Sequence, residues 1–161
     1  MTSLPLLALS ATMNVVRSAK LVALYAVPLV LWARAAPLDP RFSGQYASLT
    51  STAVLFAFAG TSAFAINLVL GARLRPVEAF FGGLDRMYQV HRINGQLAYA
   101  LLLCHVALVL AGRATLSLTT ALDLVGPGAG WTVFAGVLAF IAFTIAIALT
   151  LFVRLGHEVF V

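Results

Sequence analysis

Charged side chains are scarce in this sequence, and their scarcity excludes most classes of protein. The 161 residues include only ten Lys or Arg and five Asp or Glu, which together make up 9% of the chain. A soluble domain carries about 25% charged residues, so a soluble enzyme and a charged disordered tail are both excluded. The short segments of alternating polarity that are typical of outer-membrane strands are also absent. With 62% hydrophobic residues, the composition instead predicts an all-α integral membrane protein.

Cysteine occurs once, as Cys104. A single cysteine cannot form an internal disulfide, so a disulfide-rich secreted module is excluded. The Cys-x-x-Cys-His motif of covalent haem attachment is also missing, so any haem must be held without a covalent bond. Residues 1–16 resemble a secretory signal only weakly, because Arg17 and Lys20 follow the apolar stretch instead of preceding it. We expect this segment to lie at the membrane interface and to lead into the first span.

Charge disappears over four stretches, which predict four transmembrane helices at about 19–36, 49–70, 91–112 and 131–153. The last residues, 158–161, resemble the first turns of a fifth helix. We therefore expect one domain over 1–161 that forms part of a helical bundle.

The second predicted span contains two features that favour contact with another helix. The segment 60–63, Gly-Thr-Ser-Ala, forms a patch of small residues that suits close helix packing. Asn67 is the one strongly polar side chain of this span, and we interpret it as the partner in a hydrogen bond between helices.

The ten basic residues flank the apolar stretches, which favours membrane orientation and contact with lipid headgroups over nucleic-acid binding. If the N-terminus is cytoplasmic, seven of them lie on the cytoplasmic side: Arg17, Lys20, Arg73, Arg75, Arg86, Arg92 and Arg154. The remaining three, Arg34, Arg41 and Arg113, then lie outside. The positive-inside rule therefore predicts a multi-pass protein of the inner or plasma membrane with a cytoplasmic N-terminus.

His91 and His105 belong to the third predicted span and have the spacing i, i+14. At about 100° per residue, this spacing places the two imidazoles within about 40° of each other on one helix face. It also separates them by about 21 Å along the helix axis, which is too far for one shared metal ion. Ionisable groups inside a membrane are rare and usually functional. The pair therefore predicts two stacked metal centres. The alternative role of each histidine is a hydrogen bond to a neighbouring helix, and His91, which is nearer the interface, could also face solvent or lipid headgroups.

Haem fits such a site better than zinc, because zinc requires about four clustered ligands and haem needs only one or two from the protein. His91 and His105 are the predicted axial ligands of haem iron. Gly95, one turn after His91, would leave room for a flat macrocycle, and close packing against another helix explains it equally well. Arg92 and Arg86 lie at the His91 end, where they would pair with haem propionates or serve only as topology charges.

The segment 84–105, LDRMYQVHRINGQLAYALLLCH, resembles the ferric reductase-like transmembrane domain superfamily. That superfamily includes ferric reductases, NADPH oxidases and the haem subunit of a methionine sulfoxide reductase system. The matching elements are Leu84-Asp85-Arg86, His91 followed by Arg92, and His105. The order of spans also agrees: two helices, a basic loop, a helix with two histidines, and an apolar helix.

This resemblance implies a six-helix bundle that holds two stacked b-type haems. Each iron would be held by one histidine of the third helix and one of the fifth, so that His91 ligates the inner haem and His105 the outer one. Electrons would come from a cytoplasmic flavin and cross to an acceptor outside. FAD and NAD(P)H are expected only on another domain or a partner subunit, because this chain has no Gly-rich dinucleotide motif.

The end of the chain, RLGHEVFV at 154–161, resembles the entry to the family's fifth helix, so we expect the sequence to stop before the fifth-helix ligands. We interpret His157 as an interfacial histidine, because it lies several residues too early to be the inner ligand. The predicted function is transmembrane electron transfer in the membrane part of a ferric reductase-like oxidoreductase. The alternative is a membrane scaffold or assembly subunit without a cofactor. A transporter is disfavoured, because no span has paired Gly/Pro breaks or buried acids.

Overall fold

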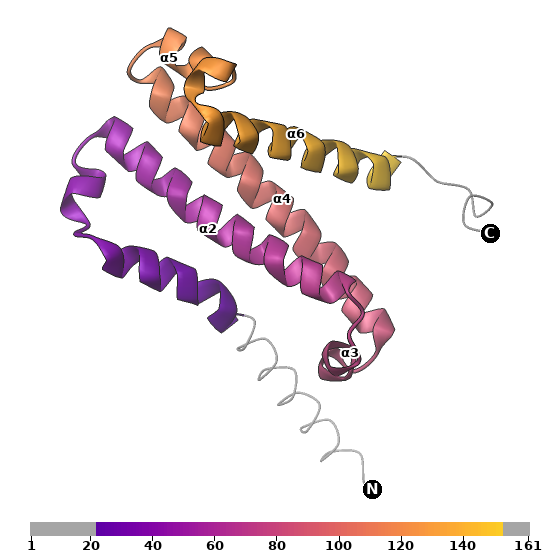
Figure 1. Ribbon diagram of the computed structural model, residues 1–161. Helices are drawn as coiled ribbons and strands as arrows, with labels where there is room; N and C mark the ends of the chain where they lie inside the picture. The colour runs from indigo at the N-terminus through magenta and orange to yellow at the C-terminus, as the bar shows by residue number, and fades with distance from the viewer. Residues whose placement is uncertain (1–21, 153–161) are drawn as a thin grey trace, which may run out of the picture. The chain divides into compact units, whose positions relative to one another are not determined.

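The computed structural model describes residues 22–152, which form helices and connecting turns with no strand (Figure 1). The predicted all-α membrane fold class is confirmed. Three described helices are long and apolar enough to cross a membrane, and a fourth apolar helix is shorter. Three predictions concern residues 1–21 and 153–161 and so lie outside the described residues: the interfacial N-terminal segment, the start of a fifth helix, and His157.

The chain divides into two compact units, Met1–Gly112 and Arg113–Val161. The described elements of the first unit are the helix Val22–Ala35, the 3-10 helix η1 (Asp39–Phe42), α2 (Gln45–Gly71), α3 (Arg75–Phe81) and α4 (Leu84–Ala114). The last two residues of α4 fall in the second unit, which also contains α5 (Leu118–Asp123), η2 (Pro127–Ala129) and α6 (Trp131–Phe152).

Both α2 and α4 extend beyond the predicted spans 49–70 and 91–112. They have 27 and 31 residues, so each is about 40 Å or more in length at 1.5 Å per residue. α4 begins at Leu84, and its first turn carries Asp85, whose negative charge is favourable at a helix N-terminus. In α4 the charged residues Asp85, Arg86, Arg92 and Arg113 lie towards the two ends of the helix, so the absence of charge marks only its apolar part, whereas α2 carries no charge along its whole length.

Small residues allow α2 and α4 to pack closely. Gly60 and Ala63 of α2 are buried. A Cβ atom on Gly60 would lie 3.2 Å from Leu102 Cγ of α4, so a larger residue fits there only if Leu102 is displaced. The close helix contact predicted for the small residues of the second span is confirmed at these two positions.

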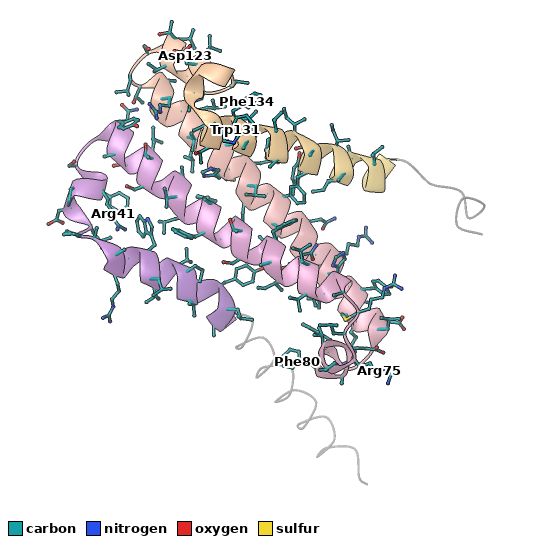
Figure 2. The ribbon with its side chains drawn as sticks, in the orientation of Figure 1. Arg41, Arg75, Phe80, Asp123, Trp131 and Phe134 are labelled. Carbon is teal, nitrogen blue, oxygen red and sulfur yellow. The ribbon has the colours of Figure 1, made fainter. Side chains whose placement is uncertain are left out.

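Arg41 connects the helix Val22–Ala35 to α2. Its Nη1 donates a hydrogen bond to the Trp32 carbonyl oxygen at 2.7 Å, and its guanidinium carbon lies 4.1 Å from the centroid of the Trp32 ring. The Ser51 hydroxyl of α2 donates to the carbonyl oxygen of Arg41 at 2.8 Å. Figure 2 shows Arg41 at the turn between the two helices. This turn holds one end of the first unit together.

A small apolar core lies at the other end of α2, where α3 leads into α4. Leu70, Phe81 and Met87 are buried there against one another. The chain reverses at Gly82 and Gly83, whose φ angles of 79° and 124° lie in the left-handed region that favours glycine. This core fixes the first turns of α4 and so the height at which His91 meets α2.

In the second unit, short helices precede one long apolar helix. Ser117 caps α5, because its hydroxyl oxygen accepts a hydrogen bond from the Thr120 backbone N–H at 3.1 Å. In α6, every side chain described between Trp131 and Leu149 is exposed or half-buried within the chain. This pattern suits a helix that faces lipid or other helices.

Candidate functional site

The two histidines of α4 make the same kind of contact with α2. His91 Nδ1 lies 3.2 Å from the carbonyl oxygen of Asn67, and His105 Nδ1 lies 2.8 Å from the carbonyl oxygen of Ala53. Both imidazoles are half-buried. The two acceptors have the same i, i+14 spacing on α2 as the two histidines have on α4. Both rings therefore lie on the face of α4 that contacts α2. The two helices run antiparallel, and both contacts fit one alignment of α4 against α2.

These contacts define the proton position on each ring. A carbonyl oxygen only accepts hydrogen bonds, so each Nδ1 carries a proton and each Nε2 of a neutral ring keeps its lone pair. Among the described residues no group bonds to either Nε2. No described side-chain nitrogen or oxygen is both buried and without a partner.

This arrangement fits the axial ligands of a haem. A histidine that binds metal through one ring nitrogen usually donates the N–H of the other to a carbonyl or carboxylate. The hydrogen bond to a neighbouring helix, which the sequence suggested as the alternative role of each histidine, is present here. It uses one nitrogen of each ring and is compatible with ligation through the other.

The residues between the histidines also face α2. A Cβ atom on Gly95 would lie 3.0 Å from Asn67 Nδ2, and Ala98 is fully buried. Leu102 packs against Gly60. Of the two roles predicted for Gly95, close packing against another helix is therefore observed. Its place beside a macrocycle stays a prediction.

A buried amide that the sequence analysis did not select, Asn94, lies at the His91 end of this face. Its Nδ2 donates to the carbonyl oxygen of Ala63 at 2.7 Å and to Asn67 Oδ1 at 3.3 Å, and Tyr25 donates its hydroxyl proton to Asn94 Oδ1. The hydrogen bond between helices predicted for Asn67 is thus confirmed. Asn94 itself could have been found by the signal that identified Asn67, a strongly polar side chain within an apolar helix.

The basic residues at the His91 end and the single cysteine have exposed side chains. Arg92 and Arg86 are exposed on α4, and so is Cys104, next to His105. Pairing of Arg92 or Arg86 with a propionate stays a prediction. Among residues 22–152, no three His, Cys, Asp or Glu side chains come together in the manner of a metal site built by the protein alone. His91 and His105 are the two histidines of residues 22–152.

Comparison with protein-family models matches residues 56–161 to the ferric reductase like transmembrane component. No curated protein and no solved structure matches the chain significantly. The matched residues include both histidines and all of α4 and α6, and they begin after the helix Val22–Ala35. Because the match covers well over half of a chain whose helices can cross a membrane, this multi-pass membrane protein belongs to the family of ferric reductase like transmembrane components.

Proposed function

We propose that this chain carries electrons across a membrane through two b-type haems, one held by His91 and the other by His105. Its family makes the chain a component of a membrane oxidoreductase. The single observation that supports haem binding is the matched pair of contacts, His91 with Asn67 and His105 with Ala53. These contacts leave one free nitrogen on each ring. One histidine would be enough to form a hydrogen bond between the two helices. Two histidines with equivalent contacts on one face of α4 instead suggest two equivalent sites.

The chain's own residues position and tune the ligands. When bound, haem supplies one-electron redox chemistry. The two α2 carbonyls fix the tautomer of each imidazole, orient its Nε2 and raise its basicity. Arg92 and Arg86 lie near the His91 end and would offset the negative charge of propionates. In a membrane, the apolar side chains of α2 and α4 would help to exclude water from the site.

The electron donor is a flavin-containing reductase domain or subunit on the cytoplasmic side. Seven of the ten basic residues lie on that side if the N-terminus is cytoplasmic, and the basic loop between α2 and α4 is then its largest cluster. His91 lies nearer to this loop than His105 does, so electrons would reach His91 first.

The test is the reduced-minus-oxidised absorbance spectrum of membranes that contain the full-length protein. We expect sharp b-type bands in the wild type. His91→Ala should remove the contribution of one haem to these bands, and His105→Ala the contribution of the other. His157→Ala is the matched control, and it should leave the bands unchanged. If the bands keep their full strength in His91→Ala and His105→Ala, the assignment is wrong.

The same experiment separates electron transfer from the alternative, a membrane scaffold without a cofactor. A scaffold predicts colourless purified protein and normal folding in cells that are starved of haem. Loss of bands in His157→Ala would instead assign a ligand role to the third histidine.

A further inference from the structure

We infer that Tyr25, Asn94 and Asn67 act together as a polar lock that positions His91, and that His105 is held without such a lock. The inference rests on the proposed role of His91 as a ligand. It goes beyond that role, because it makes the helix Val22–Ala35 part of one histidine site and not of the other. Tyr25 lies outside the residues matched by the family model.

Asn94 links His91 to α2 by a second route. It lies at i+3 from His91, so the two side chains lie on neighbouring parts of the same face of α4. The residue Asn94 is 8% exposed, and its Nδ2 donates to both Ala63 and Asn67. Asn67 is thus held by Asn94 through its side chain, and it holds His91 through its backbone carbonyl.

Tyr25 sets the orientation of the Asn94 amide. Its hydroxyl donates to Asn94 Oδ1, so the oxygen of the amide faces the helix Val22–Ala35 and the nitrogen faces α2. The reversed orientation would place Asn94 Oδ1 against the carbonyl oxygen of Ala63, where two acceptors repel. The hydroxyl of Tyr25 therefore stabilises the one orientation in which Asn94 can hold Asn67.

The His105 end is built differently. The carbonyl that accepts from His105 belongs to Ala53, which is fully buried and has only a methyl side chain. The methyl group of Ala53 cannot form a hydrogen bond to another helix, as the side chain of Asn67 does. Within residues 22–152, the position of the His105 acceptor depends on helix packing, whereas that of the His91 acceptor depends also on the polar lock.

The polar lock has a predictable effect on the ligand. A well-placed acceptor for Nδ1–H makes an imidazole a stronger donor to metal, which stabilises the oxidised form of a haem iron. If the lock is broken, the acceptor of His91 becomes less well placed and the imidazole becomes a weaker donor. The reduction potential of the haem at His91 should then rise, and that of the haem at His105 should not change.

The first test needs no haem. It compares Tyr25→Phe and Asn94→Leu with Tyr46→Phe in the full-length apoprotein in lipid bilayers. Tyr46 of α2 makes no hydrogen bond among the described residues. Tyr46→Phe therefore also removes a tyrosine hydroxyl, but at a position outside the polar lock. In ¹⁵N spectra, the Nδ1 signal that is lost in His91→Gln should shift towards a weaker hydrogen bond in both lock variants. The Nδ1 signal that is lost in His105→Gln should stay in place, and Tyr46→Phe should move neither.

The second test is a redox titration of the same variants with haem bound. The component that His91→Gln removes should move to higher potential in Tyr25→Phe and Asn94→Leu, and the other component should not move. Tyr25→Phe keeps the aromatic ring, so it tests the lock even if Asn94→Leu does not fold.

Each outcome of these tests decides the inference. An unchanged Nδ1 signal of His91 in Tyr25→Phe overturns it. An equal shift at both histidines also overturns it, because such a shift indicates general loosening of the bundle. Absence of haem from the wild type would overturn the proposed function instead, since the apoprotein spectra report on the lock without haem.

Discussion

At the scale of single residues, backbone carbonyls of α2 decide how the histidines are held. Asn67 and Ala53 each lie within a helix, and a carbonyl oxygen has a second lone pair that can accept from a side chain. Substitution of either residue keeps a backbone carbonyl at that position, although at Asn67 it would also remove the side chain that Asn94 holds. The sensitive positions are therefore the neighbours that hold each ring against its carbonyl, and Gly71 is one of them.

Gly71→Val should weaken metal binding at His91. A Cβ atom at this position would lie 3.4 Å from His91 Cε1, so the two additional carbons of Val would need further space close to the ring. Displacement of the ring from the Asn67 carbonyl removes an outer-shell contact of a kind that costs about tenfold or more in metal affinity. Difference spectra under limiting haem measure the effect. Gly136→Val is the control, because a Cβ atom on Gly136 meets nothing within 4 Å.

At the scale of helices, α4 packs along one face of α2. α2 carries both acceptors of the histidines and the small residues that let the two helices approach. The two helices are in contact from Gly71 of α2, which lies beside His91, to Gly112 of α4. A Cβ atom added to Gly112 would lie 3.4 Å from Thr50 Oγ1 of α2. A change that separates the helices should therefore affect both histidines together.

Gly60→Leu is such a change. Its side chain would enter the space now filled by Leu102, whose Cγ lies 3.2 Å from an added Cβ atom. Overpacking of this kind costs about 1–3 kcal/mol in folding free energy. Unfolding in mixed detergent micelles measures the loss, with Gly136→Leu as the matched control. Stability equal to that of the control would contradict the close packing of α2 and α4.

Arg41→Lys tests the turn that joins the helix Val22–Ala35 to α2. Lysine keeps the charge but loses the planar guanidinium that lies on Trp32 while it bonds the Trp32 carbonyl oxygen. We expect a loss of about 1–2 kcal/mol, because a hydrogen bond from a charged donor contributes about 1.5–3 kcal/mol and lysine retains part of it. Hydrogen exchange of residues 22–35 should become faster in this variant. Unchanged exchange would show that charge alone is sufficient at this turn.

At the scale of the whole molecule, the distribution of basic residues predicts the orientation in the membrane. In a Cys104→Ser background, Ala79→Cys on α3 should react with a membrane-impermeant thiol reagent only from the cytoplasmic side. Thr119→Cys on α5 should react only from the opposite side. Both positions are exposed in the structure, so access to them depends on the membrane and not on packing. Labelling with the two sides exchanged would reverse the proposed orientation and the order in which electrons meet the histidines.

Scarcity of charge and the period of the α-helix were enough to establish an all-helical membrane protein, two histidines on one helix face, and a hydrogen bond between helices at Asn67. These properties depend on local composition and on spacing along one helix, which do not require knowledge of any partner. The register of α2 against α4, the carbonyl that each imidazole meets, and the contact of Tyr25 with Asn94 depended on packing. They join residues 24 to 69 positions apart, and the fit of small residues between helices selects which of them meet.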